Sequence, residues 1–223
     1  MNHQATQTSC IIVGAGPGIG EALALAFAQQ GYDVALIARS VAKFADFVLE
    51  VSKLGRRART YAADAGNESV LRDAIARAET ELGPAEVLIY NAADSRTGKP
   101  MVLTTQRLMD EFRVNVAGAL VAAQAVAEGM KTRRRGSIFF TGGSFAYEPA
   151  AEYSSLSLGK AALRSLTYTL AQELGKDGVH VATVTVYGFV QRGTKFDPQR
   201  IAQSFVMLHR QPKGHFDTEF IYK

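Results

Sequence analysis

The sequence predicts an α/β protein with a single doubly wound parallel sheet and helices on both of its faces. Short apolar runs alternate with amphipathic stretches along the whole chain, the order typical of this class. Runs such as 34–38 and 86–90 are continuously apolar, as in parallel strands buried on both faces. With 223 residues, 47% of them hydrophobic, the chain can bury one sizeable core. We therefore expect a single domain over residues 1–223, with residues 1–8 flexible.

A glycine-rich loop follows the first apolar run, 10–13, and opens the first amphipathic stretch, 21–30. Strand, glycine loop and helix in this order form the context of a dinucleotide-binding fingerprint, the Rossmann type of fold. The glycines permit a tight turn, close approach of a pyrophosphate and close packing of helix on strand, and the helix N-terminus favours phosphate. An ordinary loop is the alternative. The residues expected to bind the cofactor here are Gly14, Gly16, Gly18, Ile19 and Gly20.

The second expected strand, 34–38, ends at Arg39. In dinucleotide folds an acidic residue near this point accepts the ribose hydroxyls, whereas an arginine accommodates a 2′-phosphate. Asp33 precedes the strand and so lies at its opposite end. Arg39 therefore favours NADP(H) over NAD(H), unless it is a plain surface arginine.

The remaining elements follow in order. A helix over 41–54 is closed by Gly55, and Asn67 caps a helix that runs to residue 82. Helical patterns also cover 105–131, 153–175 and 198–208. The further strands are expected at 59–63, 86–90, 136–141, 179–186 and 216–222. Ligand is expected at the carboxyl ends of these strands.

The helix over 105–131 carries one apolar stripe, and Asn115 lies off it near the helix middle. Such a residue usually faces solvent or bonds a neighbouring carbonyl, but it can also bend the helix toward a site. The stripe consists of Leu108, Phe112, Val116, Leu120, Ala123 and Ala127.

Composition argues against several other classes of protein. The single cysteine, Cys10, lies in an apolar run and excludes an internal disulfide. The net charge is +4, but the basic cluster at 131–135 follows a helix end, where a solvated turn favours cations. No zinc-ligand spacing, signal peptide or membrane-spanning segment is present in the sequence. We expect a cytoplasmic protein without a metal and with neither nucleic acid nor membrane as partner.

Taken together, these segments resemble a short-chain dehydrogenase/reductase over nearly the whole chain. The resemblance implies that Asp64 contacts adenine, that Asn115 belongs to the catalytic tetrad and that Lys160 holds the nicotinamide ribose. It also implies that Gly188 and Val190 touch the nicotinamide carboxamide. Tyr90 and Ala93 depart from the family's Asn-Asn-Ala-Gly motif, in which Asn91 and Ala92 are retained. The matching segments are 14–20, Asp64, 90–93, Asn115, 160–163 and 188–190.

Two of the four tetrad positions lack the needed chemistry. In the family a tyrosine precedes the lysine by one helical turn, and its pKa is lowered by the ammonium. Leu156 stands there in this chain, and Gly143 stands at the expected serine. Ser144, one residue later, is the candidate hydroxyl, with a role in capping its loop as the alternative. The ending from Ile201 to Pro212 resembles an atypical branch of the family that also lacks the tyrosine.

The resemblance implies an NADP(H)-dependent oxidoreductase that moves a hydride between the nicotinamide and a small carbonyl or alcohol substrate. Lys160, Asn115 and Ser144 are the candidate catalytic residues. A catalytically inert NAD(P)-binding sensor or partner subunit is the alternative, because ribose binding by Lys160 does not need a phenol. The family commonly pairs its two long helices, so we expect a homodimer or a homotetramer.

Overall fold

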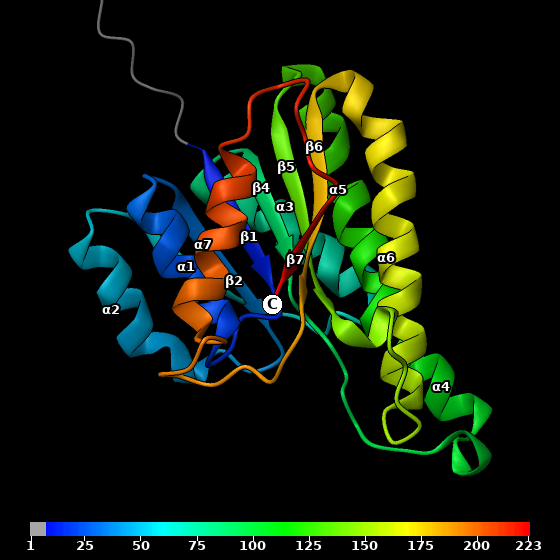
Figure 1. Ribbon diagram of the computed structural model, residues 1–223. Coiled ribbons are helices and arrows are strands. Elements are labelled where there is room, and N and C mark those ends of the chain that lie inside the picture. The colour runs from blue at the N-terminus through cyan, green and yellow to red at the C-terminus, as the bar shows by residue number, and fades with distance from the viewer. Residues whose placement is uncertain (1–7) are drawn as a thin grey trace, which may run out of the picture.

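The computed structural model describes residues 8–223. Its centre is one sheet of seven parallel strands in the order β3-β2-β1-β4-β5-β6-β7 (Figure 1). The predicted doubly wound parallel sheet is therefore confirmed. The flexible segment expected over residues 1–8 falls almost entirely outside the described residues.

The observed elements follow the expected order closely. Asn67 caps α3 as predicted, since its side chain accepts a hydrogen bond from the backbone N–H of Val70. The last strand is shorter than expected. The strands are β1 Ser9–Val13, β2 Asp33–Ala38, β3 Ala58–Ala62, β4 Ala85–Tyr90, β5 Gly136–Gly143, β6 Val179–Val186 and β7 Glu219–Tyr222. The helices are α1 Ile19–Gln29, α2 Ala45–Lys53, α3 Glu68–Leu82, α4 Thr105–Phe112, α5 Gly118–Arg133, α6 Ser154–Leu174 and α7 Pro198–His209.

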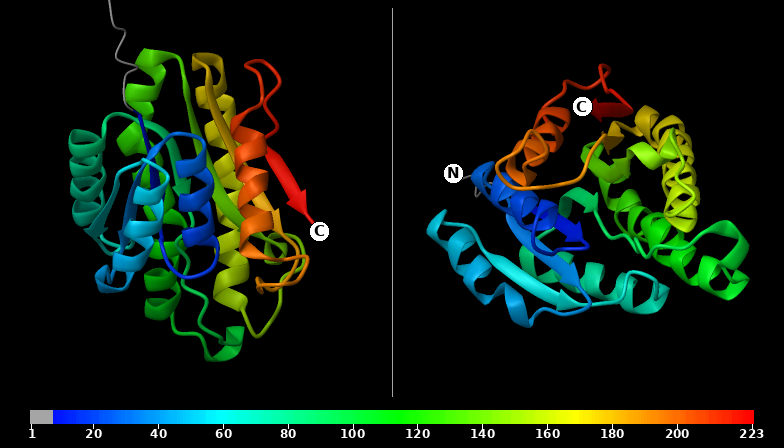
Figure 2. Two further views of the ribbon diagram at one scale, coloured as in Figure 1. Left: turned by 90° about the vertical axis from the view of Figure 1, so that its left-hand side faces the viewer. Right: turned by 60° about the horizontal axis from the view of Figure 1, so that its bottom comes forward.

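Two apolar layers enclose the sheet, one on each face. Side chains such as Phe27 and Phe205 pack α1, α2 and α7 against one face. Leu71, Val126 and Leu163 pack α3, α5 and α6 against the other face. Figure 2 shows the helices on both sides when the molecule is turned. With both faces covered, the central strands β1, β2 and β4 are apolar at successive positions, which is why they read as continuous apolar runs.

The long helical stretch after β4 is not one regular helix. A π-helical turn, Arg113–Ala117, separates α4 from α5. The predicted stripe does not face the core throughout, since Leu120 is exposed, whereas Glu111, Asn115 and Ala119 are buried. Asn115 is therefore buried in the π-helical turn and does not face solvent, which was one of the alternatives that the sequence left open.

The basic cluster at 131–135 has a structural role in part. The guanidinium of Arg133 donates to the backbone carbonyl of Ala85 at 2.7 Å, and Arg135 pairs with Glu86 at 2.5 Å. These contacts attach the end of α5 to the start of β4. Among residues 8–223, no helix combines the length and apolar character that crossing a membrane requires.

Candidate functional site

A cleft of about 830 Å³ opens at the carboxyl ends of the central strands. Five of the predicted cofactor-binding residues line it, and they come from the ends of β1, β2, β3 and β4. This is the edge of an open parallel sheet where ligands bind. The five residues are Gly14, Arg39, Asp64, Asn91 and Ala92.

The glycines of the loop have different tasks. Gly14 has φ +86°, and a Cβ there would lie 2.3 Å from the backbone nitrogen of Ala92, so only glycine fits. A Cβ at Gly20 would lie 3.0 Å from the Cα of Ala15, so this glycine allows close backbone packing. A Cβ at Gly16 or Gly18, by contrast, would meet no described atom within 4 Å. Gly14 and Gly20 thus allow close packing within the protein, while Gly16 and Gly18 leave the backbone open to a ligand.

The loop leads directly into the N-terminus of α1. Gly18 is the N-cap of that helix and makes no side-chain cap, and Ile19 is its first residue. The free N–H groups and the positive end of the helix dipole therefore face the open side of the loop. A nicotinamide dinucleotide fits this arrangement, because its pyrophosphate needs close backbone approach and N–H donors.

Arg39 and Asp64 lie at neighbouring strand ends on the wall of the cleft. Arg39 is exposed, so its guanidinium is available to a ligand. Asp33 opens β2 at its far end and accepts hydrogen bonds from Arg57, which removes it from the cleft as expected. Asp64 accepts a hydrogen bond from the backbone N–H of Gly66 at 2.9 Å, which orients its carboxylate beside the cleft.

A chain of hydrogen bonds joins the glycine loop to Lys160. The amide of Asn91 donates to the carbonyl of Gly14 at 2.9 Å and accepts from the Thr141 hydroxyl at 2.9 Å. The Thr141 carbonyl then accepts from the Lys160 ammonium at 2.6 Å. Residues from β1, β4, β5 and α6 are thereby connected at one edge of the sheet.

Lys160 is held at this edge without a counter-ion in the described part of the chain. Burial lowers the pKa of Lys160 to about 8. A Cβ at Gly143 would lie 3.7 Å from the lysine Cε, an ordinary contact, so the flank of the lysine is open at that position. Leu156, one turn earlier on α6, is buried and offers no proton.

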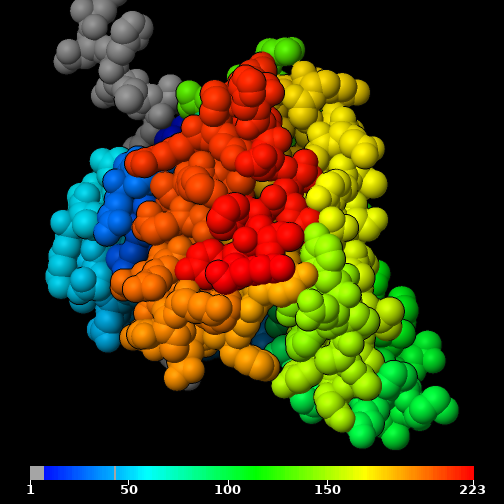
Figure 3. All heavy atoms as spheres, in the orientation of Figure 1, coloured from blue at the N-terminus to red at the C-terminus, as the bar shows by residue number. Residues whose placement is uncertain are grey.

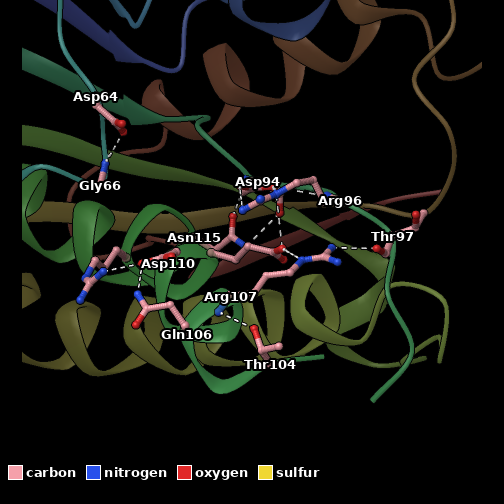
Figure 4. A network of polar contacts seen from close by, with 12 residues as sticks. Asp64, Gly66, Asp94, Arg96, Thr97, Thr104, Gln106, Arg107, Asp110 and Asn115 are labelled. Atoms are coloured by element: carbon pink, nitrogen blue, oxygen red, sulfur yellow. Dashed lines mark hydrogen bonds and ion pairs between the residues drawn. The ribbon is translucent and has the colours of Figure 1, made fainter. Parts of the chain in front are cut away.

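Asn115 is positioned by the loop that follows β4. Its side chain accepts from the backbone N–H of Asp94 at 2.7 Å and donates to the carbonyl of the same residue at 3.1 Å (Figure 4). Burial would raise the pKa of Asp94, but hydrogen bonds and the charge of Arg96 lower it. Asn115 is therefore engaged with the cleft wall, since Asp94 and Arg96 line the cleft.

The π-helical turn itself has a specific partner. Tyr90, fully buried at the end of β4, donates its hydroxyl to the carbonyl of Val114 at 2.5 Å. A Cβ at Gly118 would lie 2.4 Å from that hydroxyl oxygen, so glycine is required beside it. The departure from the family motif at Tyr90 thus caps a backbone carbonyl of the turn that carries Asn115.

The remaining candidates lie in loops outside the large cleft. Ser144 is the first residue of a short helical turn. Its backbone carbonyl accepts hydrogen bonds from the backbone N–H groups of Tyr147 and Glu148. Gly188 and Val190 belong to the exposed loop after β6. Figure 3 shows a hollow between this loop, in orange, and the loop after β5, in yellow-green. Among residues 8–223, no hydrogen bond joins Lys160 to Ser144, Gly188 or Val190, and the Lys160 ammonium donates instead to the Thr141 carbonyl.

Sequence reasoning missed three residues of this region, Asp94, Arg96 and Thr141, and it noted Tyr90 only as a departure from the family motif. Asp94 and Arg96 directly follow the Asn91–Ala93 motif, and Thr141 ends an apolar run. Polar residues at or just after the end of an apolar run could therefore have indicated that these three residues lie at the site. The contact of Tyr90 with Val114 spans 24 positions, and no local pattern in the sequence marks it.

Comparisons with known proteins agree with this geometry. A family model described as short chain dehydrogenase matches residues 8–199. A 2,3-dihydro-2,3-dihydroxybenzoate dehydrogenase from Bacillus subtilis is 31% identical over 174 residues, covering 78% of this chain and 67% of that protein. A cyclohexanol dehydrogenase from a Rhodococcus species is 30% identical over 227 residues, covering 93% and 83%.

Solved structures share the same fold. A metagenomic short-chain oxidoreductase in complex with NADP superposes with a TM-score of 0.87 at 25% identity, over 97% of both chains. A short-chain dehydrogenase from Rhodopseudomonas palustris gives a TM-score of 0.88 at 24% identity, over 97% of this chain and 98% of that one. The glycine loop, the cleft beside it and these matches lead to one conclusion: the chain belongs to the short-chain dehydrogenase family.

Proposed function

We propose that this protein is an NADP(H)-dependent oxidoreductase that interconverts a small carbonyl compound and its alcohol. The observation that carries the proposal is the hydrogen-bonded chain from Gly14 through Asn91 and Thr141 to Lys160. It joins the loop that would hold the pyrophosphate to the lysine that would hold the ribose. The relative from Rhodococcus, named a cyclohexanol dehydrogenase, supports the substrate class.

Residues of this chain can be assigned to the pyrophosphate, the adenine and the carboxamide of the cofactor. When bound, NADPH supplies the hydride. Gly16, Gly18 and Ile19 would offer backbone N–H groups to the pyrophosphate, and Asp64 would contact the adenine. Gly188 and Val190 are assigned to the carboxamide by their place in the family motif.

Lys160 and Asn115 would then act near the reacting atoms. The ammonium has three N–H donors, of which the Thr141 carbonyl uses one. The others are available to the ribose hydroxyls and to a relay water near Asn115. Ser144 is proposed as a hydroxyl that reaches the substrate after a shift of its loop.

The tetrad is degenerate, because Leu156 and Gly143 replace the proton donor and the substrate-binding hydroxyl. Losing a positioned general acid typically slows a reaction by ~10²–10⁴-fold, so slow turnover is expected. The test pairs NADPH binding, followed by fluorescence, with hydride transfer to a panel of carbonyl compounds. Binding without any transfer would instead support an inert sensor or partner subunit.

Arg39→Ala should weaken NADPH binding by about 10- to 100-fold and leave NADH binding nearly unchanged. The reason is that the guanidinium would meet only the 2′-phosphate, and hydrogen bonds to charged groups contribute about 1.5–3 kcal/mol. Fluorescence titration with both nucleotides measures the two affinities. Equal losses for NADPH and NADH would contradict the assignment.

We also propose that two copies pair through the long helices at 105–131 and 153–175. An apolar groove of about 610 Å³ lies between the start of α4 and α6, and Leu158 on its wall is 53% exposed. Leu158→Glu should shift the protein toward the monomer, because it places a charge in an apolar contact. Light scattering of the parent protein and of the Leu158→Glu variant tests this prediction.

A cytoplasmic location stays a prediction of the sequence.

A further inference from the structure

The proposed reduction needs a proton for the carbonyl oxygen, and neither Leu156 nor Gly143 can deliver one. Lys160 is joined to the glycine loop by a chain of hydrogen bonds that runs through Thr141 and Asn91. An ammonium carries protons that it can release. The position of the lysine therefore points to more than ribose binding.

We propose that Lys160 itself delivers the proton, a role that rests on the oxidoreductase function proposed above. In the reduction, the hydride of the reduced nicotinamide adds to the carbonyl carbon while the ammonium gives one proton to the carbonyl oxygen. The C=O π bond becomes one C–H and one O–H bond. The lysine is left as a neutral amine, which regains its proton from water. In the alcohol oxidation the neutral amine accepts the hydroxyl proton.

One flank of the lysine carries no side chain in contact at Gly143. Its methylene chain runs past Gly143, where a Cβ would lie 3.7 Å from Cε, so no side chain covers that flank. Lys160 is half-buried as a residue. The Thr141 carbonyl, 2.6 Å from Nζ, fixes the ammonium at the sheet edge. One N–H is thereby anchored, and two remain for a ribose and a carbonyl oxygen.

The surroundings favour release of the proton near neutral pH. Thr141 and Gly143 on β5, Asn91 after β4 and Asn115 in the π-helical turn are all uncharged. The next charged group on α6, Arg164, is paired with Glu219 at 2.9 Å. Burial alone accounts for the lowered pKa of about 8. A donor whose pKa lies near the working pH combines sufficient protonation with sufficient driving force.

The sign of the pH dependence follows. Carbonyl reduction requires the ammonium, so kcat should be constant below pH 8 and fall about tenfold per unit above it. Alcohol oxidation requires the amine, so its kcat should rise through the same range. If Lys160 supplied only a fixed charge, both directions would fall together as that charge was lost.

Lys160→Arg is the decisive variant. Arginine keeps the positive charge and the N–H donors but does not release a proton in this pH range. We expect kcat for reduction to fall by ~10²-fold or more, while the Kd for NADPH, measured by fluorescence, changes less than about threefold. A kcat within tenfold of the parent would overturn the proposal.

A second variant keeps the test valid if arginine does not fit. Lys160→Cys can be alkylated to S-aminoethylcysteine, an amine of lower pKa, since the only other cysteine, Cys10, is buried. We expect activity to return with the pH inflection moved to lower pH. Restored activity with an unmoved inflection would count against Lys160.

Two measurements separate this proposal from the proposed function. NMR titration of labelled lysine in the NADP⁺ complex should show a midpoint near pH 8 for the Lys160 signal, which the Lys160→Arg variant identifies. A midpoint at the usual lysine value would overturn the proposed proton transfer but not the proposed oxidoreductase function. Tyr153 lies seven positions before Lys160, and Tyr153→Phe should leave kcat unchanged. A large fall in kcat in this variant would instead assign the proton to the Tyr153 phenol. If no nicotinamide nucleotide binds the parent, both proposals fail.

Discussion

Leu156→Tyr combined with Gly143→Ser should raise the rate of carbonyl reduction by about 10²- to 10⁴-fold. Residue 156 lies one turn before Lys160 on α6, about 6 Å along the helix axis. A phenol there would lie close to the ammonium, which lowers its pKa and makes it a proton donor. Gly143 has φ −162°, an extended conformation open to any residue, and its Cβ would be in ordinary contact with Lys160. Steady-state kinetics against the carbonyl panel measure the gain.

The matched control is Leu156→Phe with Gly143→Ser, which adds the ring without the phenolic proton. It should show the parent rate, because the ring alone donates nothing. Equal gains in the tyrosine and phenylalanine variants would point to altered packing of α6 instead. A tyrosine variant no faster than the parent would mean that the native donor is already sufficient.

Gly14→Ala should lower the free energy of unfolding by about 2–5 kcal/mol and abolish NADPH binding. The new Cβ would lie 2.3 Å from the nitrogen and 2.4 Å from the Cα of Ala92, both backbone atoms. The positive φ of +86° adds backbone strain for any L-residue other than glycine. Denaturant unfolding and fluorescence titration give the two results.

Gly16→Ala is the control within the same loop. A Cβ there would meet no described atom within 4 Å, and its φ is not positive. Its unfolding midpoint should match the parent, although NADPH binding is expected to weaken where the ligand would approach the backbone. Similar destabilisation by both substitutions would show that the loop is held by something other than the contact of Gly14 with Ala92.

The fold was predictable because its signals are local. Continuous apolar runs marked the strands β1, β2 and β4, and the glycines at 14–20 marked the turn from β1 into α1. The cap at Asn67 and the position of Arg39 at a strand end were likewise readable from neighbouring residues. The register of parallel strands then brings these ends together without further information.

The candidate site was less predictable, because it depends on contacts between distant residues. The stripe through Leu120 assumed a regular 3.6-residue period, and the π-helical turn breaks that period between α4 and α5. Nothing near Asn115 in the sequence indicates that Asp94 will hold it, 21 positions away. Likewise, the order of Gly14, Asn91, Thr141 and Lys160 in a hydrogen-bonded chain emerges only from the assembled sheet.

The π-helical turn has a consequence for engineering and for divergence. A turn of this kind contains about one residue more than an α-helical turn, so removing one residue from Arg113–Ala117 would regularise the helix. Asn115 would then swing by roughly 100° about the axis, away from Asp94. Tyr90 would lose the acceptor at Val114, leaving a buried phenol without a partner. A deletion of one codon, about 100 positions from the glycine loop in the sequence, would thus disrupt one wall of the cleft while leaving the seven strands in register.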